Sequence, residues 1–433
     1  METKNNTYTT EVLPEKAILA GVDTGKSNWL AEDSLAELEG LAKTAGAVVV
    51  GRTVQKKERP DTALFLGKGK VAEVTLMAQE LEADLLILDD EITPSQQRNL
   101  ESVTGLRVVD RTALILDIFA QRARSSAGKL QVELAQLKYN LPRLGGQGLV
   151  LSRLGGGIGT RGPGETKLEM DRRRIRSRIH DLTEKIDKLK AQRQLHRIQR
   201  KNSRVPVAAL VGYTNAGKST ILNALAGSNE VMAEDLLFAT LDPTTRLIQL
   251  DDKQEILLTD TVGFIQKLPH TLVSAFQATL EETAEADLLI HVVDASDVNY
   301  ELQIQAVMEV LKEIGAENKP AIFVFNKADK LPVLQFPDNH VEKRMLQGRE
   351  GVVISAKNPA GLEILREKIK SFFAQSNITL KLCIPYEQGH LVTRLHDVAK
   401  VEAIDYNDKG TVMELTMSVS DAEPYLKYEI KDK

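Results

Sequence analysis

Residues 212–219 read Gly-Tyr-Thr-Asn-Ala-Gly-Lys-Ser, and this order and spacing are typical of a loop that binds phosphate. The glycines allow a close approach of the backbone, so successive N–H groups can point at phosphate oxygens near the positive end of a helix. We expect the Lys218 ammonium to reach the β- and γ-phosphates and the Ser219 hydroxyl to bind Mg2+. Such a loop lies between a strand and a helix, and an apolar run at 205–211 followed by a helical pattern at 219–225 predicts both.

Two further segments carry groups that respond to a γ-phosphate. Residues 255–258 predict a strand that leads to Asp260, whose carboxylate would hold Mg2+ through water, and the Gly263 N–H would face the γ-phosphate. Thr240 is our candidate for the switch threonine that adds its hydroxyl to the metal, although a cap of its own loop is an alternative role. The expected metal ligands are Ser219, Thr240 and Asp260, and the expected catalytic residues are Lys218, Thr240 and Gly263.

A separate segment is suited to recognising a base. An apolar run at 321–325 leads to Asp329, whose carboxylate can accept two hydrogen bonds from the N1–H and the exocyclic amine of guanine. Adenine lacks this donor pair, and a buried carboxylate left unpaired is costly. We expect Asn326 to tie the base loop to the phosphate loop, Lys327 to pack over the ring, and residues 355–357 to offer a backbone donor to the guanine oxygen.

These segments together predict a guanine-nucleotide site. Each is short enough to arise by chance, and their order along the chain makes the combination specific. The residues expected to contact GTP are Gly212, Tyr213, Thr214, Asn215, Ala216, Gly217, Lys218, Ser219, Phe238, Ala239, Thr240, Leu241, Asp242, Asp260, Thr261, Val262, Gly263, Asn326, Lys327, Ala328, Asp329, Ser355, Ala356 and Lys357.

The composition of the chain is that of a soluble globular protein. Its 433 residues are 42% hydrophobic and allow two to four domains. The single cysteine, Cys383, excludes an internal disulfide framework and fits a reducing compartment. Residues 1–10 are polar, and no apolar stretch has membrane-spanning length. We therefore expect a cytoplasmic monomer that does not insert into a membrane.

The chain divides into four regions by pattern. Residues 1–120 alternate apolar runs with helical stretches and predict a small α/β domain. Residues 121–204 predict a helical hairpin with a glycine-rich loop, and residues 205–375 a GTP-binding domain with a mostly parallel sheet and flanking helices. Residues 376–433 predict a small α+β domain without recognisable chemistry. The expected fold class is thus α/β, with a P-loop GTPase domain between smaller N- and C-terminal domains.

The predicted hairpin is an arm with a basic second helix. Apolar residues recur in a heptad-like rhythm in both helices, so the two stripes can pack together. Residues 171–204 contain thirteen Lys or Arg and four Asp or Glu, which favours a phosphate-rich partner, although a solvated helix face is the alternative. The candidate RNA-contacting residues near the glycine-rich loop are Arg161, Arg172, Arg173 and Arg174.

Two segments outside the general nucleotide motifs resemble the HflX family of translation-associated GTPases. They are residues 155–169, continued by Asp-Arg-Arg-Arg-Ile at 171–175, and Phe-Ala-Thr-Leu-Asp-Pro-Thr-Thr-Arg at 238–246. The resemblance implies a GTPase that binds the large (50S) ribosomal subunit and its rRNA, with the N-terminal domain and arm reaching toward the intersubunit region. It also implies that ribosomes are split into subunits and that hydrolysis controls release.

The residue after Gly263 has a consequence for catalysis. Many Ras-like enzymes carry a glutamine there to orient water, whereas this chain has Phe264, so we expect slow hydrolysis until a partner orders the switches. Asn215 is a candidate for holding K+ beside the phosphates, with a hydrogen bond to its own loop as the alternative. A GTP-regulated RNA-binding or ribosome-assembly factor would use the same site and is the alternative function.

Overall fold

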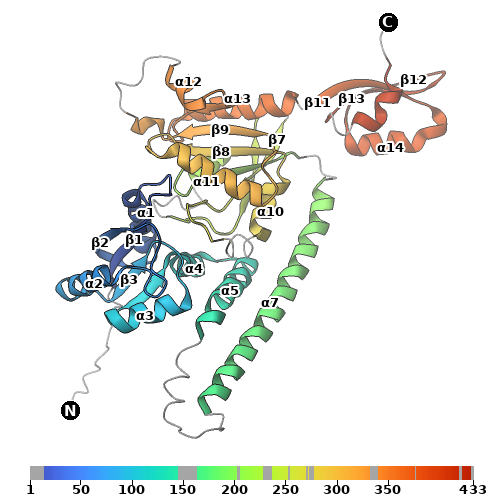
Figure 1. The fold of residues 1–433 in the computed structure, drawn as a ribbon. Coiled ribbons are helices and arrows are strands. Elements are labelled where there is room, and N and C mark those ends of the chain that lie inside the picture. Colours follow the sequence, from blue (N-terminus) through green and yellow to red (C-terminus); the bar gives the residue numbers. More distant parts are fainter. Residues whose placement is uncertain are drawn as a thin grey trace, which may run out of the picture.

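The computed structural model describes residues 14–144, 163–201, 205–227, 237–251, 254–269, 272, 277–331, 340–375, 377–418 and 422–430. Three sheets follow one another along the chain, and a two-helix arm connects the first sheet to the second (Figure 1). The predicted α/β class is confirmed, because the first two sheets are parallel or mostly parallel and carry helices on both faces. Within the described ranges, no helix has both the length and the apolar character needed to cross a bilayer.

The N-terminal sheet is parallel throughout, with the order β2-β1-β3-β4. Its elements are β1 (Lys16–Asp23), α1 (Ala31–Thr44), β2 (Val48–Lys56), α2 (Lys68–Leu81), β3 (Leu85–Leu88), α3 (Pro94–Thr104), β4 (Arg107–Asp110) and α4 (Arg111–Arg122). Alternate residues of β1 face two cores: Ala17 and Leu19 pack with α1 and α4, and Ile18 and Ala20 pack with α2 and α3. Burial on both faces explains why the two central strands, β1 and β3, read as continuous apolar runs.

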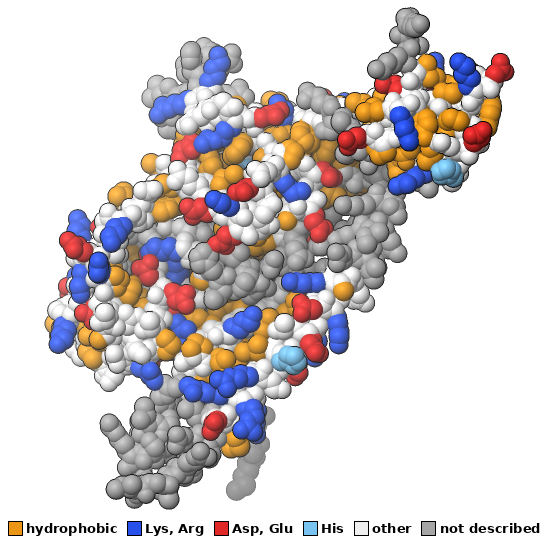
Figure 2. Space-filling model, turned by 45° about the vertical axis from the view of Figure 1, so that its right-hand side comes forward, with side chains coloured by type: hydrophobic (Ala, Val, Ile, Leu, Met, Phe, Trp, Pro, Cys, Tyr) orange, Lys and Arg blue, Asp and Glu red, His pale blue; other side chains and the backbone are white. Residues whose placement is uncertain are grey.

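The arm consists of two antiparallel helices that extend away from the sheets (Figure 1). Its elements are α5 (Ser126–Asn140), the short η1 (Leu141–Leu144) and α7 (Pro163–Lys201). Leu134, Leu182 and Ile186 form the buried seam between the helices, and Arg178 pairs with Glu133 across it at 2.7 Å. Lys and Arg side chains gather toward the lower end of α7 in Figure 2.

The central sheet has the order β10-β9-β8-β5-β7-β6, and its strands are parallel except β6, which runs antiparallel to β7. Its elements are β5 (Val207–Gly212), α8 (Lys218–Ala226), β6 (Thr244–Gln249), β7 (Glu255–Asp260), α10 (Gln277–Glu285), β8 (Leu288–Asp294), α11 (Tyr300–Glu313), β9 (Ala321–Asn326), η2 (Ala328–Lys330), α12 (His340–Leu346), β10 (Gly351–Val353) and α13 (Pro359–Gln375). The parallel strands β5, β7 and β9 end at Gly212, Asp260 and Asn326. The topology therefore brings three predicted site segments to one edge of the sheet.

The C-terminal region is a separate antiparallel sheet with the order β11-β13-β12. Its elements are β11 (Asn377–Ile384), η4 (Tyr386–Gln388), α14 (Gly389–Val398), β12 (Lys400–Asn407), β13 (Gly410–Ser418) and η5 (Glu423–Tyr428). Leu382 and Leu415 of the sheet pack with Leu395 of α14 in a core of their own. This small α+β unit stands apart from the central sheet (Figure 1).

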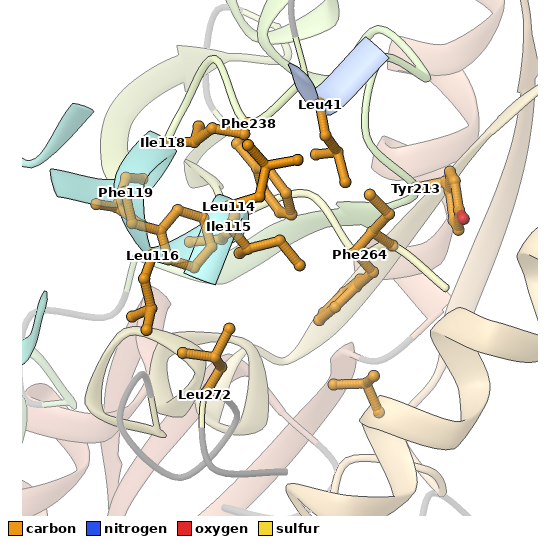
Figure 3. Packing of buried hydrophobic residues seen from close by; sticks show 14 of the residues in the cluster. Leu41, Leu114, Ile115, Leu116, Ile118, Phe119, Tyr213, Phe238, Phe264 and Leu272 are labelled. Carbon is orange, nitrogen blue, oxygen red and sulfur yellow. The ribbon is translucent and has the colours of Figure 1, made fainter. Parts of the chain in front are cut away.

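One hydrophobic cluster crosses from the N-terminal region into the central region. It joins Leu114 and Phe119 of α4 to Phe238 of the first switch (residues 238–242) and to Phe264 of the second switch (residues 260–267) (Figure 3). The rings of Phe119 and Phe238 meet edge to face, with centroids 4.8 Å apart. The N-terminal domain is therefore packed directly on the segments expected to respond to the nucleotide.

Candidate functional site

The loop at 212–219 joins β5 to α8, so the predicted strand, loop and helix are all present. Gly212 has a φ of 150°, and a Cβ there would lie 2.1 Å from the Val292 carbonyl oxygen. Gly217 has a φ of 98°, and a Cβ there would lie 2.2 Å from Asn326 Nδ2. Both positions require glycine, because a side chain would strain the backbone and collide with a packed neighbour.

Three oxygen-bearing side chains converge beside this loop. Ser219 Oγ donates to Asp260 Oδ2 at 2.6 Å, Thr240 Oγ1 donates to the same oxygen at 3.0 Å, and the two hydroxyl oxygens lie 3.0 Å apart. Among the described residues, buried Asp260 Oδ1 has no hydrogen-bond partner. Burial raises the pKa of Asp260, and Lys218 lowers it in part. A set of oxygen ligands with a buried, unpartnered carboxylate oxygen fits Mg2+, whose charge would favour the ionised carboxylate.

Lys218 lies beneath the phosphate loop and is buried. Its ammonium donates to the carbonyl oxygens of Gly212 at 3.1 Å and Tyr213 at 2.8 Å. Burial lowers the pKa of Lys218 to about 8, and Asp260 raises it in part. A Cβ at Gly263 would lie 3.1 Å from Lys218 Nζ, so this glycine keeps the second switch close to the ammonium. An anion such as a phosphate would stabilise the charged form of the lysine here.

The base-recognition residues lie at the end of β9. Asn326 Nδ2 donates to the Ala216 carbonyl oxygen at 2.9 Å, and the Ala356 N–H donates to Asn326 Oδ1 at 2.9 Å. The Asn326 amide thus ties the phosphate loop to the segment after β10, as its predicted role requires. Ser355 Oγ donates to Asp329 Oδ1 at 2.6 Å, and this hydrogen bond lowers the pKa of the exposed carboxylate. Asp329 is therefore a charged acceptor at the mouth of the site.

A cavity of about 270 Å3 unites the five predicted segments. Its lining residues are Thr214, Asn215, Gly217, Lys218, Ser219, Thr220, Phe238, Ala239, Thr240, Thr261, Gly263, Asn326, Lys327, Asp329, Lys330, Ser355, Ala356 and Lys357. The Lys327 ammonium pairs with Asp294 at 2.8 Å while the residue forms part of the wall. Thr220 and Lys330 were not among the predicted contacts, and only their positions next to predicted residues could have indicated them.

The remaining predicted residues do not line this cavity. Leu241 is buried in the cluster between the domains, and Asp242 hydrogen-bonds to the start of α5. These two residues face the N-terminal domain and the arm, whereas Phe238, Ala239 and Thr240 line the cavity. The others lie in the loops and strand ends behind the lining, and they are Gly212, Tyr213, Ala216, Asp260, Val262 and Ala328.

Phe264 belongs to the hydrophobic cluster (Figure 3). It is not among the residues that line the cavity. Its side chain is 1% exposed. Its backbone pairs with the phosphate loop, because the Thr214 N–H donates to its carbonyl oxygen at 2.8 Å and its own N–H donates to Gly212 at 3.1 Å. The position after Gly263 therefore serves packing, and its side chain has no polar atom that could orient water.

A buried contact between Tyr213 and α1 joins the phosphate loop to the N-terminal domain. The Tyr213 hydroxyl donates to the Glu37 carboxylate and accepts the Gln266 N–H at 2.7 Å. Burial raises the pKa of Glu37, although Arg111 and Tyr213 lower it in part. No sequence motif indicated this contact, because Glu37 and Tyr213 are 176 residues apart.

Ion pairs extend this contact to the second switch. Arg111, whose side chain is 1% exposed, pairs with Glu37 and with Asp89, the latter at 2.7 Å. Lys267 of the second switch also pairs with Asp89. Charges buried at this depth are stable only when they are paired, so the cluster holds the two domains in a defined register.

The arm presents part of the predicted RNA-binding set. Arg173 and Arg174 are exposed on α7, and Arg172 is half-buried. Arg174 Nη1 lies 3.8 Å from Asp171 Oδ1, one helical turn away. Arg161 lies outside the described residues. Contact of these side chains with RNA stays a prediction.

Three family models match most of the chain between residues 32 and 327. Residues 32–120 match a family model described as the GTP-binding GTPase N-terminal region, and residues 122–200 match the GTP-binding GTPase middle region. Residues 207–327 match the model described as 50S ribosome-binding GTPase.

Individual relatives are similar over the same span. The GTPase HflX of Caldanaerobacter subterraneus is 49% identical over 396 residues, which cover 92% of this chain and 89% of the relative. The GTPase HflX of Escherichia coli is 41% identical over 402 residues, covering 92% of each chain. A GTP-binding protein of Sulfolobus solfataricus, solved in complex with GDP, is 25% identical, with coverage of 83% of this chain and 99% of that chain and a TM-score of 0.44.

Proposed function

Because the chain belongs to the HflX family of GTPases, we propose that it associates in its GTP-bound form with the large (50S) ribosomal subunit in the cytoplasm. There it splits ribosomes into subunits or prevents the subunits from joining, and hydrolysis of GTP controls its release. The observation that carries this proposal is the contact of both switch segments with the N-terminal domain, through the hydrophobic cluster and the Lys267–Asp89 ion pair. Loss of the γ-phosphate can thereby change the position of the N-terminal domain and the arm, which are the parts expected to contact the ribosome.

The arm supports the assignment of rRNA as the partner. Exposed Arg173 and Arg174 lie next to half-buried Arg172 on the helix that enters the arm from the glycine-rich segment. Arginine is suited to phosphate because its planar guanidinium donates bidentate hydrogen bonds. We assign Arg161, Arg172, Arg173 and Arg174 to contacts with the RNA backbone.

The buried position of Phe264 supports slow intrinsic hydrolysis of GTP. No glutamine follows Gly263, so the ribosome would have to order the switches or supply a group that positions water. Asn215 lines the cavity and has a φ of 59°, and we propose that it helps to hold K+ beside the phosphates. Equal turnover in potassium and sodium buffers would remove the role of K+ and leave the rest of the proposal intact.

The proposed function is tested by adding the protein to intact ribosomes with a non-hydrolysable GTP analogue and separating the products on a sucrose gradient. We expect free subunits, with the protein on the large subunit, and far fewer free subunits with GDP. Intact ribosomes together with protein on isolated large subunits would overturn splitting and favour the assembly factor.

Substituting the arginines of α7 tests the arm separately. Replacing Arg172, Arg173 and Arg174 by glutamine removes three candidate phosphate contacts. The slope of log affinity against log salt for large subunits should become shallower by about 2–3, since each phosphate contact contributes roughly 0.7–0.9. GTP hydrolysis without ribosomes serves as the control and should not change. An unaltered salt slope would show that these residues do not contact RNA.

A further inference from the structure

Asp242, two residues after Thr240, contacts the first helix of the arm. Its Oδ2 accepts the Arg124 N–H at 2.8 Å and the Ser125 N–H at 2.7 Å, and its Oδ1 accepts the Ser125 hydroxyl. The Ser125 oxygen in turn accepts the Gly128 N–H at 2.9 Å and caps α5. A single carboxylate of the first switch thus completes the N-terminal end of an arm helix.

The helix is shaped to receive this carboxylate. A Cβ at Gly128 would lie 2.4 Å from Asp242 Oδ1 and 3.3 Å from its carboxyl carbon. Gly128 is a buried residue within the first turn of α5, where glycine is a poor helix former compared with alanine. The absence of a side chain here lets the switch approach α5 closely.

The segment is short enough that the two ends cannot move independently. Two extended residues span at most about 7 Å. The position of Thr240 beside Asp260 and the position of Asp242 at α5 therefore constrain each other. Phe238, on the other side of Thr240, is anchored against Phe119 (Figure 3). After Asp242 and Pro243 the chain enters β6, where Thr244 pairs with Asp260.

We propose that Asp242 is a positioning residue for Thr240, and that it makes the start of the arm responsive to the nucleotide. Its contact with α5 holds the Thr240 hydroxyl beside Ser219 Oγ and Asp260 Oδ2, the side chains that would hold Mg2+. Release of Thr240 after hydrolysis removes Asp242 from α5. By reciprocity, anything that pulls α5 away weakens binding of the triphosphate. The proposal concerns the GTP site alone and does not depend on the ribosome.

Two variants test this link. Asp242→Ala removes the carboxylate, and Gly128→Ala displaces it while leaving it in the chain. Gly69→Ala is the matched control, because Gly69 also lies in the first turn of a helix, α2, and a Cβ at this position would have no neighbour within 4 Å among the described residues. The variants at Gly128 and Gly69 share the gain in helix propensity, so a difference between them reports the displaced carboxylate.

The affinities of the three variants for a non-hydrolysable GTP analogue and for GDP are measured with Mg2+ in excess. In its proposed role, Thr240 contacts the metal only when a γ-phosphate is present. We therefore expect Asp242→Ala and Gly128→Ala to weaken binding of the analogue by about tenfold, within the range usual for coupled sites. Their affinity for GDP should stay within about twofold, as should both affinities of Gly69→Ala. If Asp242→Ala and Gly128→Ala lost affinity equally for both nucleotides, or lost no affinity for the analogue, the proposal would be overturned.

Hydrogen exchange adds a reciprocal readout. The Arg124 and Ser125 N–H groups donate to Asp242, so in the wild type they should exchange more slowly with the analogue than with GDP. In Asp242→Ala, the Arg124 and Ser125 N–H groups should exchange fast with either nucleotide bound. Exchange at these amides that does not depend on the nucleotide in the wild type would contradict the link, even if the affinities change.

Discussion

Replacing Tyr213 by phenylalanine should loosen the second switch without unfolding the protein. The hydroxyl lost in Tyr213→Phe donates to Glu37 and accepts the Gln266 N–H at 2.7 Å. Glu37 keeps its ion pair with Arg111, whereas the Gln266 N–H has no other acceptor among the interactions of the described residues. The ring itself, which is 4% exposed, keeps its packing in the hydrophobic cluster.

The size of the effect follows from these two hydrogen bonds. A buried group left without its partner costs about 1–3 kcal/mol, so opening of the segment that contains Gln266 should become about 5 to 150 times more favourable. Burial and the neighbouring Glu37 raise the pKa of Tyr213, so the wild-type hydroxyl stays protonated as a donor at neutral pH.

Hydrogen exchange of a peptide covering residues 264–267 measures this change directly. Tyr139→Phe is the matched control, because it removes a hydroxyl that donates to Asp110 at 2.8 Å and does not contact the second switch. We expect faster exchange in Tyr213→Phe and wild-type exchange at these residues in Tyr139→Phe. If Tyr213→Phe exchanged as slowly as the wild type, the hydroxyl would not hold the switch, and the reasoning from this contact would be wrong.

Three further predictions follow from other residues. Phe264→Gln should not accelerate GTP hydrolysis and should lower the free energy of unfolding by about 3–5 kcal/mol, because the side chain is buried; faster turnover would contradict this. Asp329→Asn should weaken binding of GDP by about tenfold to 150-fold, since the amide replaces a hydrogen-bond acceptor by a donor. In competition binding the variant should prefer xanthosine diphosphate, and a retained preference for GDP would contradict this prediction. Burial lowers the pKa of His291 to about 3. The unfolded chain therefore binds more protons than the folded chain below pH about 6.5, and the free energy of unfolding should fall on acidification with a slope that approaches about 1.4 kcal/mol per pH unit at pH 5. The free energy of unfolding is measured by urea titration at pH 7, 6 and 5, and in His291→Phe it should no longer show this fall. The same change with pH in the variant and the wild type would refute the prediction.

The nucleotide site could be predicted because each part is encoded locally. Gly212, Asp260 and Asn326 each end a strand that reads as an apolar run, and a parallel sheet brings such ends to one edge. No apolar run predicts β6, because this strand is a partly exposed antiparallel edge with few apolar residues. The contact of Tyr213 with Glu37 and that of Asp242 with Ser125 could not be predicted, since these partners lie 176 and 117 residues apart and no local pattern links them.

The residue that departs from the Ras-like pattern also explains how the domains are joined. A glutamine after Gly263 would need to face the nucleotide, whereas Phe264 turns into the cluster that contains Leu114 and Phe238. Burying an aromatic ring there stabilises the contact between the second switch and α4 by roughly 1.5–3 kcal/mol. The same choice removes a polar group that could orient water. The proposed slow hydrolysis and the anchoring of the second switch to the N-terminal domain therefore depend on one side chain. A partner that accelerates hydrolysis would have to act on a segment that the N-terminal domain already holds.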